Sequence, residues 1–251
     1  MFPLRDDNPT EILPIFTSLI IAICVGVWWY VQGGGFSERA LTDSICALGA
    51  IPAEVTGRTP PSAPVGPCRL GGMTWEALLS SMFLHGSWMH LIGNVWFLWI
   101  FGNNIEDSMG HLRFLVFYLL TGVAAAAAHV LMQPDSTIPM VGASGAISGV
   151  MGAYLVLYPR ARVLTLFWFI FLIRVVPLPA WVLLGYWMVL QIAGSTASAA
   201  VGGGGVAYAA HVGGFLAGMV LIFPFRNPKL VGAKRRGVVL PRNEIDHHGW
   251  W

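Results

Sequence analysis

The sequence predicts an all-α integral membrane protein with six transmembrane helices, and three observations support this fold class. The 14 basic and 12 acidic residues make up only 10 % of the 251 residues, whereas soluble domains carry about 25 %. Five long stretches contain no Asp, Glu, Lys or Arg, and their apolar runs are continuous, which favours helices over a membrane β-barrel. The basic residues gather in alternate connections between these stretches.

The same composition excludes several other classes of protein. With so few charges, a soluble single domain is excluded, and the high apolar content excludes a disordered chain. A net charge of +2 does not fit a nucleic-acid-binding protein. We therefore expect the lipid bilayer to surround most of the chain and no nucleic acid to be a partner.

The helices are placed from the uncharged stretches, because a transmembrane helix needs about 20 predominantly apolar residues. The first four stretches each accommodate one helix and the last accommodates two, which gives helices near residues 13–31, 87–102, 113–132, 142–158, 179–195 and 205–225. Val163–Ile173 is also apolar, but it spans only 11 residues and stops at Arg174. We expect this segment to be interfacial or re-entrant and to lead into the fifth helix.

The basic residues predict the orientation, because they concentrate in cytoplasmic loops. The connection between helices 4 and 5 holds Arg160, Arg162 and Arg174, whereas the loops at 133–139 and 195–204 hold no basic residue. Further basic residues follow the last helix: Arg226, Lys229, Lys234, Arg235, Arg236 and Arg242. Both termini are therefore expected in the cytoplasm.

This topology divides the chain into an N-terminal tail (1–11), a membrane domain (12–225) and a basic cytoplasmic tail (226–251). The start of the chain lacks the basic region and cleavage site of a signal peptide, so we expect the first helix to remain in the mature protein.

A long external loop, residues 33–74, joins the first two helices and is rich in Gly and Pro. It holds Cys46 and Cys68. An extracytoplasmic location permits a disulfide between them, and two free thiols are the alternative. Cys24 lies in the middle of the first helix, where we expect a small packing residue.

Four polar side chains stand out within the predicted spans, where such residues are costly and mark candidate functional sites. Helix 2 carries His90 and Asn94 one turn apart, helix 4 carries Ser144 near its start, and helix 6 carries His211. At ~1.5 Å rise per residue, they lie about 5, 11, 3 and 9 Å below the outer ends of their helices. Since these helices run in the same direction, all four residues lie in the outer half of the bilayer.

Small residues on helices 4 and 6 predict that these helices pack closely. Helix 4 contains Gly145-x-x-x-Gly149, and helix 6 contains Ala210-x-x-x-Gly214-x-x-x-Gly218. Such ridges let two backbones approach each other. Packing along them brings the ring of His211 near Ser144.

This arrangement predicts nucleophilic catalysis by a Ser144–His211 dyad. A serine hydroxyl needs a neighbouring base to become a nucleophile, and helices 4 to 6 contain no acid that would complete a triad. His90, Asn94 and the Ser144 backbone N–H are candidate donors to an oxyanion. The alternative is structural: GASG sequences pack helices, and His90 and Asn94 hold helices together. We expect no metal and no cofactor, because the tail residues His247 and His248 resemble a metal-binding tract only superficially.

Several motifs together resemble the rhomboid family of intramembrane serine proteases, of the bacterial six-helix type. The similarity extends over residues 75–220, and the segments that carry it are His85–Asn94, Phe101–Asp107, Gly142–Gly145 and Ala210–Gly218. The resemblance implies a rhomboid-like bundle with Ser144 as nucleophile, His211 as general base, and His90 with Asn94 in the oxyanion hole. It also implies a cavity open to the outer face and single-span membrane proteins as substrates.

One departure from the family bears on the histidine. Some members have a tyrosine one turn after the serine that packs on the catalytic histidine, whereas this chain has Ser148 there. What orients His211 is left open by the sequence, with Tyr208 as one candidate.

The sequence therefore predicts an intramembrane serine endopeptidase in the cell (inner) membrane, with its active site open to the extracytoplasmic side. The alternative is a proteolytically inactive rhomboid-like protein that binds client transmembrane segments. A transporter is disfavoured, because the chain has neither the inverted repeats nor the membrane-embedded carboxylates expected of one.

Overall fold

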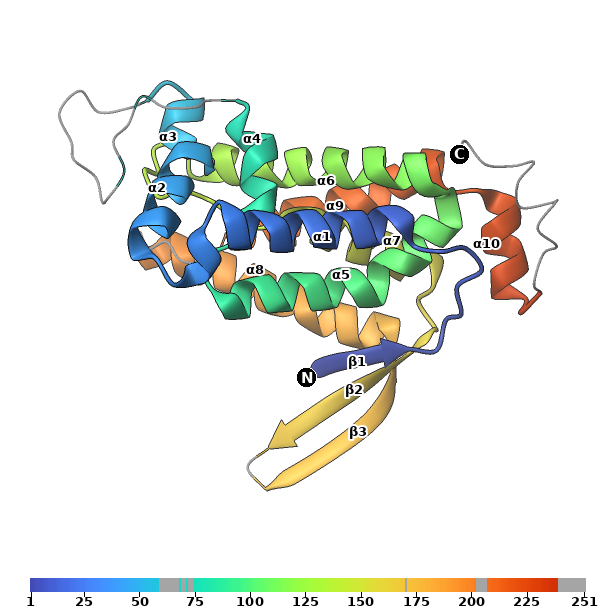
Figure 1. The fold of residues 1–251 in the computed structure, drawn as a ribbon. Coiled ribbons are helices and arrows are strands. Elements are labelled where there is room, and N and C mark those ends of the chain that lie inside the picture. Colours follow the sequence, from blue (N-terminus) through green and yellow to red (C-terminus); the bar gives the residue numbers. More distant parts are fainter. Residues whose placement is uncertain (59–67, 69–70, 72–74, 170, 202–206, 239–251) are drawn as a thin grey trace.

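The computed structural model describes all residues except 59–67, 69–70, 72–74, 170, 202–206 and 239–251 (Figure 1). The structure is mostly helical, and a long helix lies at each predicted range: α1 (Ile15–Tyr30), α5 (Trp88–Met109), α6 (His111–Met132), α7 (Ser144–Leu157), α8 (Ala180–Val201) and α9 (Tyr208–Phe225). By length and composition, His111–Met132, Ala180–Ala197 and Tyr208–Phe225 are candidate membrane spans. α1 and α7 are shorter apolar helices.

The expectation of an all-α fold is wrong in one part, because the chain also forms a three-stranded antiparallel sheet. Its order is β1 (Phe2–Asp6), β2 (Arg162–Phe169) and β3 (Leu172–Pro179). β2 and β3 form a hairpin that extends away from the helices (Figure 1). The apolar segment Val163–Ile173 is rich in β-branched and aromatic residues, which favour strands, and a helix this short does not span a bilayer.

The N-terminal strand β1 is hydrogen-bonded to the helices. The sequence places this part of the chain in an N-terminal tail (1–11). The Asp6 carboxylate accepts hydrogen bonds from the Tyr154 hydroxyl (2.5 Å) and from Asn104 Nδ2 (2.8 Å). The indole N–H of Trp96 donates to the carbonyl of Pro3 at 2.7 Å. Burial raises the pKa of the Asp6 carboxyl to about 6.

One buried carboxylate at the end of α5 holds the start of α1, and a second one contacts α10. Glu106 accepts from the backbone N–H groups of Phe16 and Thr17, at 2.9 and 2.8 Å, which are at the N-terminus of α1 and lack intrahelical acceptors. Asp107 forms an ion pair with Lys234 (2.6 Å) of α10 (Pro228–Arg235). These contacts explain why α5 continues past its predicted end at residue 102.

α7 and α9 pack backbone to backbone through glycines. A Cβ on Gly218 would overlap the carbonyl of Gly149, and one on Gly214 would overlap the carbonyl of Gly145. Only glycine therefore permits this spacing, in agreement with the ridges seen in the sequence. The packing joins the start of α7 to the first turns of α9.

The loop at residues 33–74 contains its own short elements: η1 (Gly33–Gly35), α2 (Glu38–Leu48) and α3 (Pro52–Val55). Cys46 and Cys68 form a disulfide, which decides between the two alternatives that the sequence leaves open. Cys24 is free and buried, as expected. The loop pairs with the segment before α7 through a bridge between Ala50 and Met140. Two more elements, α4 (Ala77–Ser80) and η2 (Ser81–Phe83), lead into α5.

Candidate active site

Ser144 is the first residue of α7 and follows a turn that requires glycine. Gly142 has φ = +124°, and a Cβ there would lie 2.7 Å from Nε2 of His90. A side chain at position 142 is therefore excluded both by the backbone conformation and by the imidazole ring. As the first residue of a helix, Ser144 has a backbone N–H without an intrahelical acceptor, which leaves it free to donate to a ligand.

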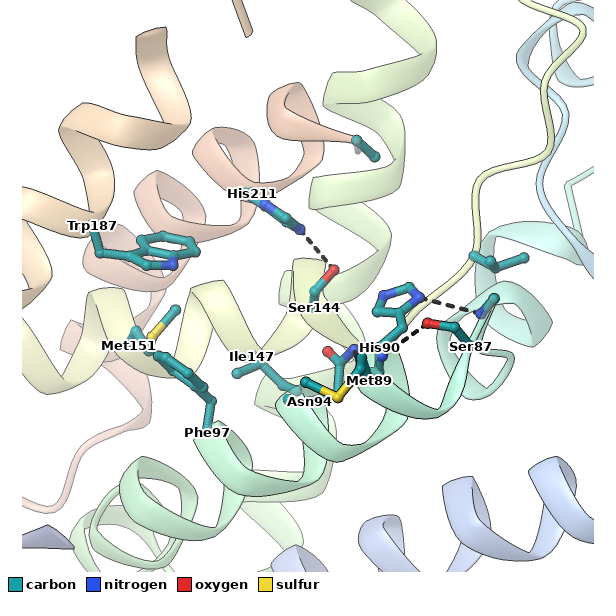
Figure 2. Close-up of a pocket in the computed structure, with 14 residues that line it drawn as sticks. Ser87, Met89, His90, Asn94, Phe97, Ser144, Ile147, Met151, Trp187 and His211 are labelled. Carbon is teal, nitrogen blue, oxygen red and sulfur yellow. Dashed lines mark hydrogen bonds between the residues drawn. The ribbon is translucent and has the colours of Figure 1, made fainter. Parts of the chain in front are cut away.

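His211 lies in the first turn of α9, and its ring reaches the Ser144 hydroxyl. The distance from His211 Nε2 to Ser144 Oγ is 2.7 Å, a hydrogen bond (Figure 2). The glycine contacts between α7 and α9 make this approach possible. The structure thus brings together the two residues that the sequence predicts as a dyad.

The other side of the His211 ring contacts residues that the sequence analysis missed. Nδ1 of His211 lies 2.7 Å from Oε1 of Gln191 on α8. The ring of Trp187, one turn earlier on α8, lies 5.8 Å from the imidazole between centroids. The predicted candidate Tyr208 also contacts the ring, edge to face, at 6.4 Å. A signal was present, because Gln191 is the lone amide side chain in residues 179–195.

His90 is held at the start of α5 by two local hydrogen bonds. The Ser87 hydroxyl caps the helix by accepting from the backbone N–H of His90 at 3.1 Å. The backbone N–H of Gly86 donates to Nδ1 of His90 at 3.2 Å (Figure 2). A backbone N–H can only donate, so Nδ1 is an acceptor and the proton of a neutral ring sits on Nε2. That Nε2–H lies on the side of Gly142 and Ser144.

Asn94 lies one turn further along α5 on the same face. Its Nδ2 donates to the carbonyl of His90 at 2.7 Å. An amide nitrogen carries two N–H groups, so this bond leaves one donor for another partner. Asn94 is buried in the structure and lines the same cavity as His90.

Ser144, His211, His90 and Asn94 all line one cavity of about 620 Å³. It lies between α5, α7, α8 and α9, and Figure 2 shows the hydrogen-bonded pair Ser144 and His211 with His90 and Asn94 beside Ser144. The rest of the lining is largely apolar, and its large side chains are Met89, Phe97, Ile147, Met151 and Trp187. The site is therefore a polar cluster at the wall of a cavity that accommodates apolar groups.

Two other described histidines, His129 and His111, do not line this cavity. His129 is buried on α6, outside the cavity lining. His111 contacts Glu106 at the end of α5. Among the described residues, no group of His, Cys, Asp or Glu is arranged to hold a metal ion. His247 and His248 lie outside the described residues.

Comparison with known proteins identifies the family. The chain is 30 % identical over 148 residues to Rhomboid protein 1, mitochondrial, of Saccharomyces cerevisiae. That alignment covers 57 % of the chain and 40 % of the yeast protein. It is 31 % identical over 142 residues to Rhomboid protease GluP of Bacillus subtilis, covering 57 % of the chain and 24 % of the relative. It is 32 % identical over 179 residues to Rhomboid-like protease 5 of Toxoplasma gondii. That alignment covers 68 % of the chain and 18 % of the relative.

The chain thus spans less than half the length of each of these relatives. A family model described as the Rhomboid domain matches residues 72–228. Because that match takes in more than half of the chain, with the segments around Ser144 and His211 inside it, the chain belongs to the rhomboid family.

Proposed function

We propose that this protein is an intramembrane serine endopeptidase that cleaves single-span membrane proteins with a Ser144–His211 dyad. The observation that carries the proposal is the 2.7 Å hydrogen bond between the Ser144 hydroxyl and His211 Nε2 in a cavity lined by further polar groups. A positioned base next to a serine is the arrangement required for acyl transfer. The mechanism needs neither a metal nor a cofactor.

In the first half of the reaction, Ser144 Oγ attacks the carbonyl carbon of the scissile peptide bond. His211 Nε2 accepts the hydroxyl proton, and the carbonyl oxygen becomes an oxyanion. Collapse of this intermediate breaks the C–N bond, and the imidazolium gives its proton to the leaving amine. The product is an ester of Ser144, which water then hydrolyses by the same steps with His211 as base.

The oxyanion needs donors, and we expect three groups of residues that line the cavity to provide them. They are Nε2–H of His90, the second N–H of the Asn94 amide, and the backbone N–H of Ser144 at the start of α7. In a site with little water, one such donor contributes about 10²- to 10³-fold to the rate.

The proposed topology has six membrane spans, with both termini in the cytoplasm and the site near the extracytoplasmic face of the cell (inner) membrane. Two observations support this orientation. Basic residues follow the C-terminal ends of α7 and α9, and cytoplasmic loops are enriched in them. The Cys46–Cys68 disulfide lies in the loop that pairs with the segment before Ser144, and disulfides persist in oxidising compartments.

The substrate class follows from the surroundings of the site. A peptide bond within a helix is shielded by its own hydrogen bonds, so a substrate span must unwind locally before Ser144 can reach the carbonyl. We therefore expect cleavage near the outer end of a substrate span, at small or helix-breaking residues.

The test is cleavage of a single-span reporter by the full chain in liposomes, with the product identified by mass spectrometry. Ser144→Ala and His211→Ala should each abolish cleavage, whereas Ser18→Ala, an exposed serine on α1, should leave it unchanged. Cleavage that persists in Ser144→Ala would refute the proposal.

A fluorophosphonate probe separates the protease from a relative that only binds client spans. The probe should label the wild type and not Ser144→Ala. An unlabelled and inactive wild type that still co-purifies with single-span proteins would favour the binding function instead.

A further inference from the structure

Gln191 connects α8 to the Ser144–His211 pair, and we propose that it is a positioning residue that selects the catalytic tautomer of His211. The inference rests on the proposed function and deepens it. Gln191 is buried, with 8 % of its surface exposed, and its Oε1 lies 2.7 Å from His211 Nδ1. It therefore contacts the ring nitrogen that does not face the serine.

The orientation of the Gln191 amide is determined by its second contact. Its Nε2 donates to the backbone carbonyl of Trp187, one turn earlier on α8, at 3.4 Å. A carbonyl oxygen can only accept, so the –NH₂ end of the amide faces Trp187 and the oxygen end faces His211. The reverse orientation would bring two oxygens together at Trp187.

This orientation determines where the proton of the neutral imidazole lies. The amide oxygen only accepts, so His211 Nδ1 must carry the hydrogen. Nε2 then has a lone pair directed at the Ser144 hydroxyl, 2.7 Å away. With the other tautomer, Nε2–H would donate to Ser144 and the ring could not remove the proton.

The same contact also supports the imidazolium formed during the reaction. Once Nε2 has taken the proton, both ring nitrogens are donors, and a buried donor without an acceptor is costly. Gln191 Oε1 continues to accept from Nδ1–H. The face of the ring is held separately by Trp187, whose side chain lies 5.8 Å away between centroids.

An amide fits this position better than the carboxylate of a serine-protease triad. A carboxylate at this depth would carry a charge into a segment, residues 175–225, that contains no charged residue. The amide supplies the acceptor without that cost. The geometry therefore adds a neutral third member to the dyad.

The experiment measures kcat, KM and the pH profile of reporter cleavage for the full chain in liposomes. Gln191→Met keeps the length and removes the acceptor, and it should lower kcat about 10- to 100-fold with KM unchanged. Gln191→Glu keeps an acceptor at Nδ1, so this variant should retain cleavage. The acid limb of its pH–rate profile should move to higher pH, because a carboxylate stabilises the imidazolium. Leu190→Met, on the exposed side of α8, is the control and should match the wild type.

Three outcomes would overturn the inference: wild-type kcat in Gln191→Met, equal losses in Gln191→Met and Gln191→Glu, or a Gln191→Glu profile identical to that of the wild type. If Gln191→Met does not fold, the pH profile of Gln191→Glu decides alone. If the wild type cleaves no reporter, the proposed function fails, but the rate at which the fluorophosphonate labels Ser144 still tests Gln191. That rate should fall about 10-fold or more in Gln191→Met and stay unchanged in Leu190→Met.

Discussion

Gln32 and His85 are joined by two reciprocal hydrogen bonds. Gln32 Nε2 donates to the carbonyl of His85 at 2.8 Å, and the backbone N–H of His85 donates to Gln32 Oε1 at 2.9 Å. Both residues are fully buried. One side chain at the end of α1 thereby binds both backbone polar groups of His85. This residue lies in the segment that leads into α5, whose first turn carries His90.

Replacing Gln32 by Leu should destabilise the protein by about 2–3 kcal/mol, because two buried backbone groups lose their partners. We expect lower reporter cleavage as well, since the chain before His90 is no longer fixed. Thermal unfolding in detergent measures the first effect. Gln133→Leu, at the half-buried C-terminal end of α6, is the matched control and should change little. Equal melting temperatures for the two variants would contradict the role of Gln32.

Gly142→Ala should abolish most activity with a smaller effect on folding. The new methyl group would lie 2.7 Å from His90 Nε2, at a φ of +124° that alanine rarely adopts. Gly185→Ala on α8 is the control, because nothing lies within 4 Å of a Cβ there. Both variants should be compared for cleavage and for probe labelling. Normal activity of Gly142→Ala would mean that His90 need not stay where it is.

Asn94→Ala should lower kcat about 10²-fold and leave KM nearly unchanged, because the amide is expected to act on the oxyanion rather than on the bound substrate. His90→Ala should have a similar effect. Steady-state kinetics with a soluble fluorogenic peptide or the membrane reporter distinguish the two parameters. A rise in KM at constant kcat would assign Asn94 to substrate binding instead.

The docking of β1 should depend on pH through Asp6. Burial raises the pKa of its carboxyl from 3.8 to about 6, so the folded state binds the proton more tightly than the unfolded state. The stability that protonation contributes is therefore complete below about pH 4 and is lost as the pH rises through 6, with a total of about 3 kcal/mol. Asp6→Asn removes this dependence.

The measurement for Asp6 is the difference in melting temperature between Asp6→Asn and wild type at pH 4.5 and at pH 8. The melting temperature of Asp6→Asn should increase relative to that of the wild type as the pH rises. A difference that stays constant between the two pH values would show that the Asp6 carboxyl does not titrate with folding.

The tip of the β2–β3 hairpin should lie in the cytoplasmic interface of the membrane. Phe171 is 98 % exposed and Trp168 is 75 % exposed, and both are apolar. The open edge of β3 keeps the hairpin out of the hydrocarbon core, where unpaired backbone groups are not tolerated. A nitroxide at Phe171→Cys should be more accessible to oxygen than to a water-soluble nickel reagent in power-saturation measurements. A label at Arg39→Cys on α2 is the aqueous reference, and identical accessibilities would contradict this placement.

The long helices and the Ser144–His211 contact could be predicted from the sequence, because both depend on simple patterns. Uncharged stretches of sufficient length give helices. The Gly214 and Gly218 ridge fixes which face of α9 meets α7, and this determines where His211 points. The positions of the remaining polar residues, His90 and Asn94, near this pair then follow from their depth along the second predicted helix.

The sheet and the Gln191 contact could not be predicted in the same way. The Phe2–Asp6 segment has little tendency of its own to form a strand, and it pairs because β2 and the Tyr154 hydroxyl lie beside it in the fold. Gln191 stood out as polar, but its partner depends on the rotation of α8 about its axis. Periodicity does not determine that rotation in a helix that is apolar on all sides.

The pairing of β1 with β2 also has a consequence for the order of synthesis. Asp6 pairs with Val163, so the ribosome must add more than 150 residues after β1 before its partner strand exists. At ~5–20 residues per second, the N-terminal strand waits roughly 8–30 seconds. During that time it stays without its neighbour while helices α1 to α7 are made. β1 is therefore synthesised long before it can reach its final place beside β2.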